Sequence, residues 1–178
     1  GIQGAVSALR ALRGRHQRDR GNQVGQAHRR DLVGRSIRPP LDIQGSEDAD
    51  SVNDASLCTL FTAGDFRFLD TGDAEADAEQ RLVDTYGPTL HATLFKAGHH
   101  GSYTSNSLAF MQAVRPKAVA VSCGLHNDYG HPHRAALQNY AEVGAEVWRT
   151  DLEGSLTFIW QNNTLNVETS ADSADFAA

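Results

Sequence analysis

Short apolar segments alternate with helical segments from residue 57 to residue 168, and no other feature of the sequence constrains the fold as much. Strands are predicted at 57–62, 66–69, 93–97, 117–122, 146–149, 155–160 and 164–168. Helices are predicted at 75–86, 105–114 and 134–143, the second with a Ser105/Asn106 cap and the third ending at Gly144. The turn at 63–65 joins the first two strands into a hairpin. The pattern predicts an α/β fold with a mixed sheet.

Charge is distributed unevenly along the 178 residues, whose formal net charge is −6. Residues 1–45 contain nine arginines, no lysine and three aspartates, a net charge of +6, so residues 46–178 carry −12. For the first segment we predict a disordered leader or a stretch that is not native to the fold, with a nucleic-acid-binding arm as the alternative. The predicted divisions are therefore 1–45, a folded body at 46–170 and a tail at 171–178. The acidic, lysine-poor body also suggests adaptation to high salt.

Composition argues against several classes of protein. No apolar run approaches the ~20 residues of a membrane-spanning helix, and we expect no signal peptide because the first residues lack a long apolar core. Cys58 and Cys123 lack CxxC spacing and cannot by themselves make a thiolate zinc site or a disulfide framework. Neither a Walker A loop nor a GxGxxG motif is present.

Aspartate and histidine side chains follow the ends of successive predicted strands. Asp73 lies in a Thr-Gly-Asp turn after the 66–69 strand, and His99 and His100 follow the 93–97 strand. The loop after the 117–122 strand contains His126, His131 and His133. Because α/β folds gather the carboxyl ends of their strands at one edge, these side chains can converge on a zinc, manganese or iron ion. Each motif also has a plain structural interpretation, as a turn former, a polar turn or the start of a helix, so the residues alone leave both open.

Two further residues are candidate nucleophiles. Ser102 lies close to His100, but the GxSxG elbow of serine hydrolases is absent. Cys123 follows a strand near His126 and is a candidate thiolate nucleophile. A small buried core cysteine is the simpler interpretation of Cys123.

Five blocks of sequence, in a fixed order, resemble a known family. They are NDASLCTLFTAGD at 53–65, FRFLDTGDAE at 66–75, LFKAGHHGS at 94–102, VSCGLHNDYGHPH at 121–133 and VWRTDLEGSLTF at 147–158. Over about residues 53–160 the chain resembles the metallo-β-lactamase-fold hydrolase domain of ComEC-type DNA-uptake (competence) proteins. The resemblance implies a four-layer αβ/βα sandwich with one or two metal ions, usually zinc and sometimes manganese.

The resemblance also implies metal ligands. Asp73 corresponds to the ligand that can bridge two metal ions. His100 corresponds to the last histidine ligand of the fold, with His99 beside it as a further ligand. Asp73 and His100 are accordingly the first two expected catalytic residues, and zinc is the expected cofactor, with manganese as the alternative.

Residues that contact the substrate are implied in the same way. His131, in the YGHPH block, is the third expected catalytic residue and is expected to contact the metal or the scissile phosphate, whereas His133 is a poorer candidate. Asn53 and Ser56 match the polar block ahead of the hairpin, and Asn53 is expected to contact substrate. Ser102, after the HHG block, is the remaining expected substrate contact.

One family motif is missing from the chain. The main metal motif, H-x-H-x-D-H, is expected upstream of the 53–56 block, but the only H-x-H is His131–His133. The chain therefore resembles the C-terminal half of the domain. Two or three ligands would bind metal weakly, unless His16, His28 or a partner chain completes the site. Half a sandwich would also expose one sheet face, which a partner chain or a second copy would cover.

Two functions from different classes remain. The first is a metal-dependent hydrolase of phosphodiester bonds, with nucleic acid or another phosphodiester as its substrate, in which the metal acts as a Lewis acid and a source of hydroxide. The alternative is an inactive half-domain that lacks the H-x-H-x-D-H motif. A thiol or serine hydrolase is a third and weaker interpretation. The resemblance also implies work outside the cytoplasm.

Overall fold

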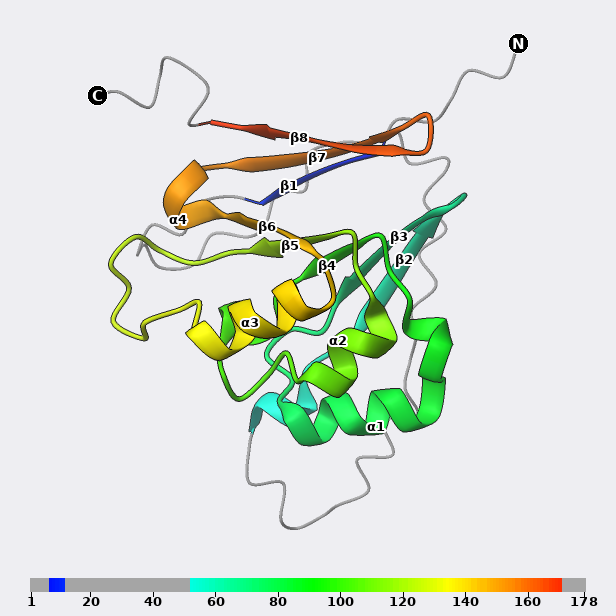
Figure 1. The fold of residues 1–178 in the computed structure, drawn as a ribbon, viewed down its shortest axis with the longest axis vertical. Coiled ribbons are helices and arrows are strands. Elements are labelled where there is room, and N and C mark those ends of the chain that lie inside the picture. Colours follow the sequence, from blue (N-terminus) through cyan, green and yellow to red (C-terminus); the bar gives the residue numbers. More distant parts are fainter. Residues whose placement is uncertain (1–6, 12–51, 171–178) are drawn as a thin grey trace.

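The computed structural model describes residues 7–11 and 52–170 (Figure 1). One sheet has five strands in the order β2-β3-β4-β5-β6. They are Thr59–Ala63 (β2), Phe66–Asp70 (β3), Leu94–Lys96 (β4), Ala118–Val121 (β5) and Glu146–Arg149 (β6). β2 and β3 form the predicted antiparallel hairpin, whereas β3 to β6 run parallel. The prediction of an α/β fold with a mixed sheet is confirmed.

A second, antiparallel sheet packs face to face on the first and has the strand order β1-β7-β8 (Figure 1). Its strands are Ser7–Ala11 (β1), Leu156–Gln161 (β7) and Thr164–Thr169 (β8). β1 is the described part of the arginine-rich segment, and it pairs with β7. The rest of that segment, with His16 and His28, and the tail at 171–178 lie outside the described residues, so the division at residue 45 stays a prediction.

Three helices cover the face of the five-stranded sheet that points away from the second sheet (Figure 1). They are Ala76–Tyr86 (α1), Leu108–Val114 (α2) and Arg134–Glu142 (α3). A one-turn helix at Thr150–Glu153 (α4) and short 3-10 turns at Val52–Ala55 (η1), Gly87–Leu90 (η2) and Gly98–Gly101 (η3) complete the described elements. Among the described residues, no helix has the length and apolarity needed to cross a bilayer.

The five-stranded sheet has an apolar core on each face, because alternate residues of a strand point to opposite sides. Phe95 and Val119 point toward the helices and join a cluster with Phe110 of α2. Leu94 and Ala118 point the other way and meet Phe158 of β7. Each fully buried large side chain stabilises the fold by about 1.5–3 kcal/mol. The second face of the five-stranded sheet is buried against β7 and β8. On β8, Thr164, Asn166 and Glu168 are exposed, so the covering of a sheet face by a partner chain stays a prediction.

Helix α2 begins later than predicted. The sequence suggested a start at a Ser105/Asn106 cap, but the helix begins at Leu108, and its N-cap residue Ser107 makes no side-chain cap hydrogen bond. Ser105 Oγ donates instead to the carbonyl oxygen of Ala74 at 2.7 Å. Asn106 has a φ of 63°, outside the helical region. Both side chains therefore serve tertiary contacts, which a pattern of helix caps does not reveal.

Candidate functional site

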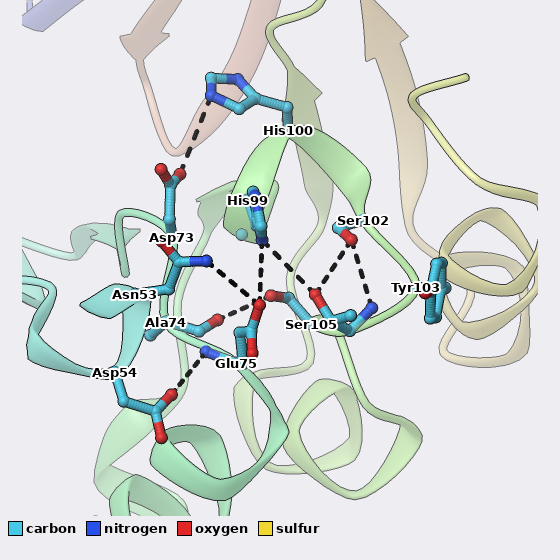
Figure 2. Close-up of polar contacts among 12 residues, drawn as sticks. Asn53, Asp54, Asp73, Ala74, Glu75, His99, His100, Ser102, Tyr103 and Ser105 are labelled. Carbon is cyan, nitrogen blue, oxygen red and sulfur yellow. Dashed lines mark hydrogen bonds and ion pairs between the residues drawn. The ribbon is translucent and has the colours of Figure 1, made fainter. Parts of the chain in front are cut away.

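The residues singled out in the sequence gather at the carboxyl edge of the parallel strands. Asp73 follows β3, His99 and His100 follow β4, and His131 lies in the loop after β5. Figure 2 shows the Asp73 and His100 side chains reaching toward each other, with His99 nearby. The shared edge brings together side chains that are up to 58 positions apart, as expected for an α/β sheet.

The Thr-Gly-Asp turn is packed tightly against the polar block ahead of the hairpin. Ser56 Oγ accepts a hydrogen bond from the Asp73 amide at 3.0 Å. Gly72 has a φ of 58°, and a Cβ there would lie 3.1 Å from Ser56 Cβ. Asp70 Oδ1 accepts from the Gly72 amide at 3.0 Å. Ser56 therefore fixes the backbone that presents Asp73, which explains its place in the polar block ahead of the hairpin.

The loop at 98–101 holds both histidines in the left-handed region, where non-glycine residues are rare. His99 has φ 47° and His100 has φ 57°. Such conformations cost about 1–3 kcal/mol each and persist only where the surroundings impose them. The His99 amide donates to the Gly72 carbonyl oxygen at 2.9 Å, which ties this loop to the Asp73 turn.

His100 is oriented by a backbone carbonyl. Its Nδ1 lies 2.8 Å from the carbonyl oxygen of Ser122, which can only accept, so Nδ1 carries the proton. In the neutral ring, Nε2 then presents its lone pair toward Asp73, whose Oδ1 is 3.8 Å away. A histidine ring held at one nitrogen by a carbonyl, with the other nitrogen free, is the usual arrangement of a metal ligand.

His99 faces a different carboxylate. Its Nδ1 lies 3.6 Å from Glu75 Oε1 and 3.4 Å from Thr104 Oγ1. Asn53 Nδ2 donates to the same Glu75 oxygen at 3.2 Å, and the Glu75 amide donates to Asp54 Oδ1 at 3.2 Å (Figure 2). The structure therefore places Asn53 beside Glu75, in contact with His99 through that carboxylate.

His131 completes a cluster of rings. Its centroid is 5.7 Å from that of His99 and 6.3 Å from that of His100, and the planes of His131 and His100 differ by 18°. Burial, and then the neighbouring histidines led by His133, lower the pKa of His131 below its usual value, while Asp73 opposes the shift. His131 is therefore neutral at neutral pH and can bind a metal or accept a proton.

The two tyrosines beside this cluster are exposed. Tyr129 stacks on His131, with centroids 5.6 Å apart and planes 20° apart. Tyr103 meets His133 edge to face at 4.9 Å, and its amide donates to His133 Nδ1 at 3.2 Å. Tyr103 and Tyr129 keep 67% and 75% of their surface in solvent. His133 thus contacts Tyr103 through both its ring and its Nδ1 atom.

The nucleophile alternatives are poorly placed. Ser102 is buried, and its hydroxyl is 3.0 Å from Thr104 Oγ1 within the loop. Burial and then the adjacent Asp151 raise the pKa of the buried Cys123 thiol to about 12. A thiol with so high a pKa provides almost no thiolate at neutral pH. Neither residue has the surroundings of an activated nucleophile.

The donor set fits a divalent metal ion in part. Zinc bonds to histidine nitrogen and carboxylate oxygen are about 2.0–2.2 Å, so two ligand atoms of one ion can lie up to about 4 Å apart. The 3.8 Å between His100 Nε2 and Asp73 Oδ1 is within that limit. Within residues 52–170, however, no group of three or more His, Cys, Asp or Glu side chains is arranged to hold a metal ion.

Sequence reasoning missed two residues of this region. Glu75 was predicted only as the first residue of the helix at 75–86, yet its carboxylate faces His99. Tyr129 was not considered, although it lies two residues before His131 and stacks on it. The spacing of Glu75 from Asp73 was a usable signal, because two carboxylates closely follow a strand end. The stacking of Tyr129 depends on the path of a loop and had no such signal.

Comparison with known proteins places the chain among relatives of competence proteins. It is 34% identical over 130 residues to ComE operon protein 3 of Bacillus subtilis, which is 72% of the chain. It is 39% identical over 106 residues, or 60% of the chain, to competence protein ComA of Neisseria gonorrhoeae. It is 30% identical over 116 residues, or 65% of the chain, to recombination protein 2 of Haemophilus influenzae.

The matched part is a small share of each relative. The chain spans 17% of the Bacillus protein, 15% of the Neisseria protein and 14% of the Haemophilus protein. No protein-family model matches the chain. The chain is thus related to competence proteins of the ComEC type, as the resemblance implied, over a segment about one sixth of their length.

Proposed function

We propose that the chain is the C-terminal part of a metallo-β-lactamase-type hydrolase domain that cleaves phosphodiester bonds in nucleic acid. The convergence of Asp73 and His100 carries the proposal: the ring is held at Nδ1 by a backbone carbonyl, and Nε2 faces the carboxylate at 3.8 Å. The layered arrangement of helices, a mostly parallel sheet and a second sheet is compatible with part of an αβ/βα sandwich.

Asp73 and His100 would hold the metal, zinc or manganese, with His99 as a further ligand beside Glu75. A bound divalent ion lowers the pKa of its water to about 7 and polarises a phosphoryl oxygen. His131, kept neutral by its surroundings, would contact the scissile phosphate or accept a proton. The remaining ligands would come from outside the described residues or from a partner chain.

Nucleic acid is the proposed substrate for two reasons. The relatives are named as competence and recombination proteins, and exposed Tyr103 and Tyr129 border the histidine cluster. Aromatic side chains beside a cleavage site stack unpaired bases without regard to sequence. The acidic body would repel phosphates, so binding of DNA would depend on the metal and on these rings.

The test is hydrolysis of bis(p-nitrophenyl) phosphate and of a single-stranded oligonucleotide with added Zn²⁺ or Mn²⁺. We expect activity that a chelator removes and that falls about 100-fold or more in Asp73→Asn and His100→Ala. His91→Ala is the matched control, because His91 is an exposed histidine away from the site. Activity that survives both site substitutions, or is indifferent to the chelator, would overturn the assignment.

An inactive half-domain is the second candidate, and the lack of a three-ligand group within residues 52–170 favours it. It predicts that the purified chain retains no metal after dialysis and hydrolyses neither substrate. Elemental analysis per mole of chain separates the two candidates: one or two equivalents of zinc or manganese support the hydrolase, and a value near zero supports the half-domain.

A further inference from the structure

The loop that carries His99 and His100 is held at both ends by one buried side chain. Asn106 Oδ1 accepts a hydrogen bond from the Gly98 amide at 2.9 Å, and Asn106 Nδ2 donates to the carbonyl oxygens of Gly98 at 2.9 Å and Ser102 at 3.1 Å. The Asn106 side-chain amide thus spans the loop from the residue before His99 to the residue after Gly101. Asn106 has no surface in solvent, so water cannot replace these bonds.

Asn106 is in turn held by a carboxylate from another element. Glu79 of α1, also fully buried, accepts from the Asn106 amide at 2.5 Å through Oε1 and from the Ser107 amide at 2.8 Å through Oε2. A third element also binds this residue, because Asn139 of α3 donates from Nδ2 to the Asn106 carbonyl oxygen at 2.9 Å. The position of Asn106 is therefore set by α1 and α3 together.

This arrangement explains how an unfavourable loop is maintained. Both histidines have positive φ, and such backbone persists only where its surroundings over-determine it. A buried carboxylate is costly to keep charged unless its oxygens receive hydrogen bonds, and here each oxygen receives one from the segment that carries Asn106. Glu79, which lies 20 positions before His99 in the sequence, thus fixes the residue that shapes the loop of the candidate metal ligands.

We propose that Asn106 is a positioning residue of the candidate site, anchored by Glu79, and that it sets the geometry of His99 and His100 for metal binding. The metal-binding part of this inference rests on the proposed function. The geometric part does not, because it concerns the two imidazoles in the metal-free protein. Loss of the Asn106 side chain should release the loop while the two cores, which lie on the faces of the sheet, stay packed.

Asn106→Gly is the test variant, because glycine adopts a φ of 63° without strain and only the side chain is lost. In the metal-free full chain, we expect the imidazole ¹⁵N resonances of His99 and His100 to shift and broaden. By isothermal titration, we expect Zn²⁺ binding to weaken about 10–100-fold, the usual effect of losing a group that orients ligands. Hydrolysis should lose kcat with little change in KM.

Phe158→Leu is the matched control, because Phe158 is buried in the core on the far face of the sheet. It lowers the unfolding temperature but should leave the histidine resonances and the Zn²⁺ affinity unchanged. The proposal would be overturned if the two variants changed the histidine resonances and the Zn²⁺ affinity to the same extent. If Asn106→Gly does not fold, Glu79→Gln serves instead, since its amide keeps one acceptor oxygen and should give a smaller change in the same direction. If the unmodified chain binds no Zn²⁺, the proposed function fails, and the histidine resonances still decide the positioning role.

Discussion

The two loops of the candidate site are each held by an asparagine, but in different ways. Asn106 is buried and binds the loop at 98–102, whose last residue lies four positions before it in the sequence. The backbone amide of Asn106 is in turn held by Glu79, which lies 27 positions earlier. Asn127 is partly buried and binds only its own loop: Nδ2 donates to the carbonyl oxygens of Gly124 at 2.9 Å and His131 at 2.7 Å, and Oδ1 accepts from the His131 amide at 2.9 Å.

This difference divides the site into two halves. The first half is the loop at 98–102, which contacts from the helices hold in place, and the second half is the loop at 124–131, which is held by hydrogen bonds within itself. The histidines at 99 and 100 are set by the packing of helices, whereas His131 and Tyr129 are set by a loop that folds on itself. A metal site needs fixed ligands, while a surface that receives a polymer tolerates adjustment. Under the proposed function, the comparison therefore predicts that the loop at 98–102 holds the metal and that the loop at 124–131 contacts the substrate.

The largest effect is expected where the two halves touch. Gly101 has a φ of 85°, and a Cβ there would lie 2.7 Å from Pro132 Cβ. Gly101→Ala combines backbone strain with overpacking and should lower the free energy of unfolding by about 3 kcal/mol. Gly144→Ala is the control, since Gly144 has a φ of 72° with nothing within 4 Å of the added Cβ, and should cost about 1–2 kcal/mol. Urea unfolding measures both, and equal losses would show that the halves are not in contact.

A smaller effect is expected for Asn127→Ala, which removes three hydrogen bonds of the second loop. Because Asn127 is partly exposed, water replaces some of them, and the expected loss of unfolding free energy is about 1–2 kcal/mol. The division of the site predicts a higher KM with an unchanged Zn²⁺ affinity. If Asn127→Ala lowered the Zn²⁺ affinity as much as Asn106→Gly does, the two asparagines would not differ in their effect on the metal ligands.

Loss of the exposed tyrosine rings should affect substrate binding alone. Tyr103→Ala and Tyr129→Ala should each raise KM for a single-stranded oligonucleotide about 10-fold, without changing its kcat. An oligonucleotide with abasic sites, which has no bases to stack, should be insensitive to both substitutions. The matching phenylalanine variants keep the ring and should behave as the unmodified chain. Equal effects on the two oligonucleotides would argue against stacking.

The smallest effect concerns the protonation of His131 in the metal-free protein. Its folded-state pKa is lowered, chiefly by burial and then by the neighbouring histidines, so the unfolded chain binds this proton at a higher pH than the folded chain. Its contribution to stability is therefore lost as pH falls from 6.5 toward the lower folded-state value. NMR titration should show that His133→Gln raises the pKa of His131 and that Asp73→Asn lowers it. Shifts in the opposite directions would contradict the arrangement of rings.

Local sequence signals predicted much of the fold. The hairpin turn at 63–65, the helix that became α1 and the strand that became β5 were recognisable because turn chemistry and apolar periodicity are properties of neighbouring residues. The same signals failed at α2, because Ser105 and Asn106 resemble helix caps while their side chains bind Ala74 and Gly98. The short helix α4 was not predicted, since four residues carry no periodicity.

The sequence by itself determined an α/β order of elements and the placement of Asp73, His99, His100 and His131 at strand ends, because strand and turn preferences act over a few residues. Only the tertiary structure decided which groups meet: Glu75 with His99, and Glu79 with the backbone of Asn106. These contacts join residues 24 and 27 positions apart. Their partners are chosen by the packing of α1 against the sheet, and the sequence has no local pattern that records such a choice.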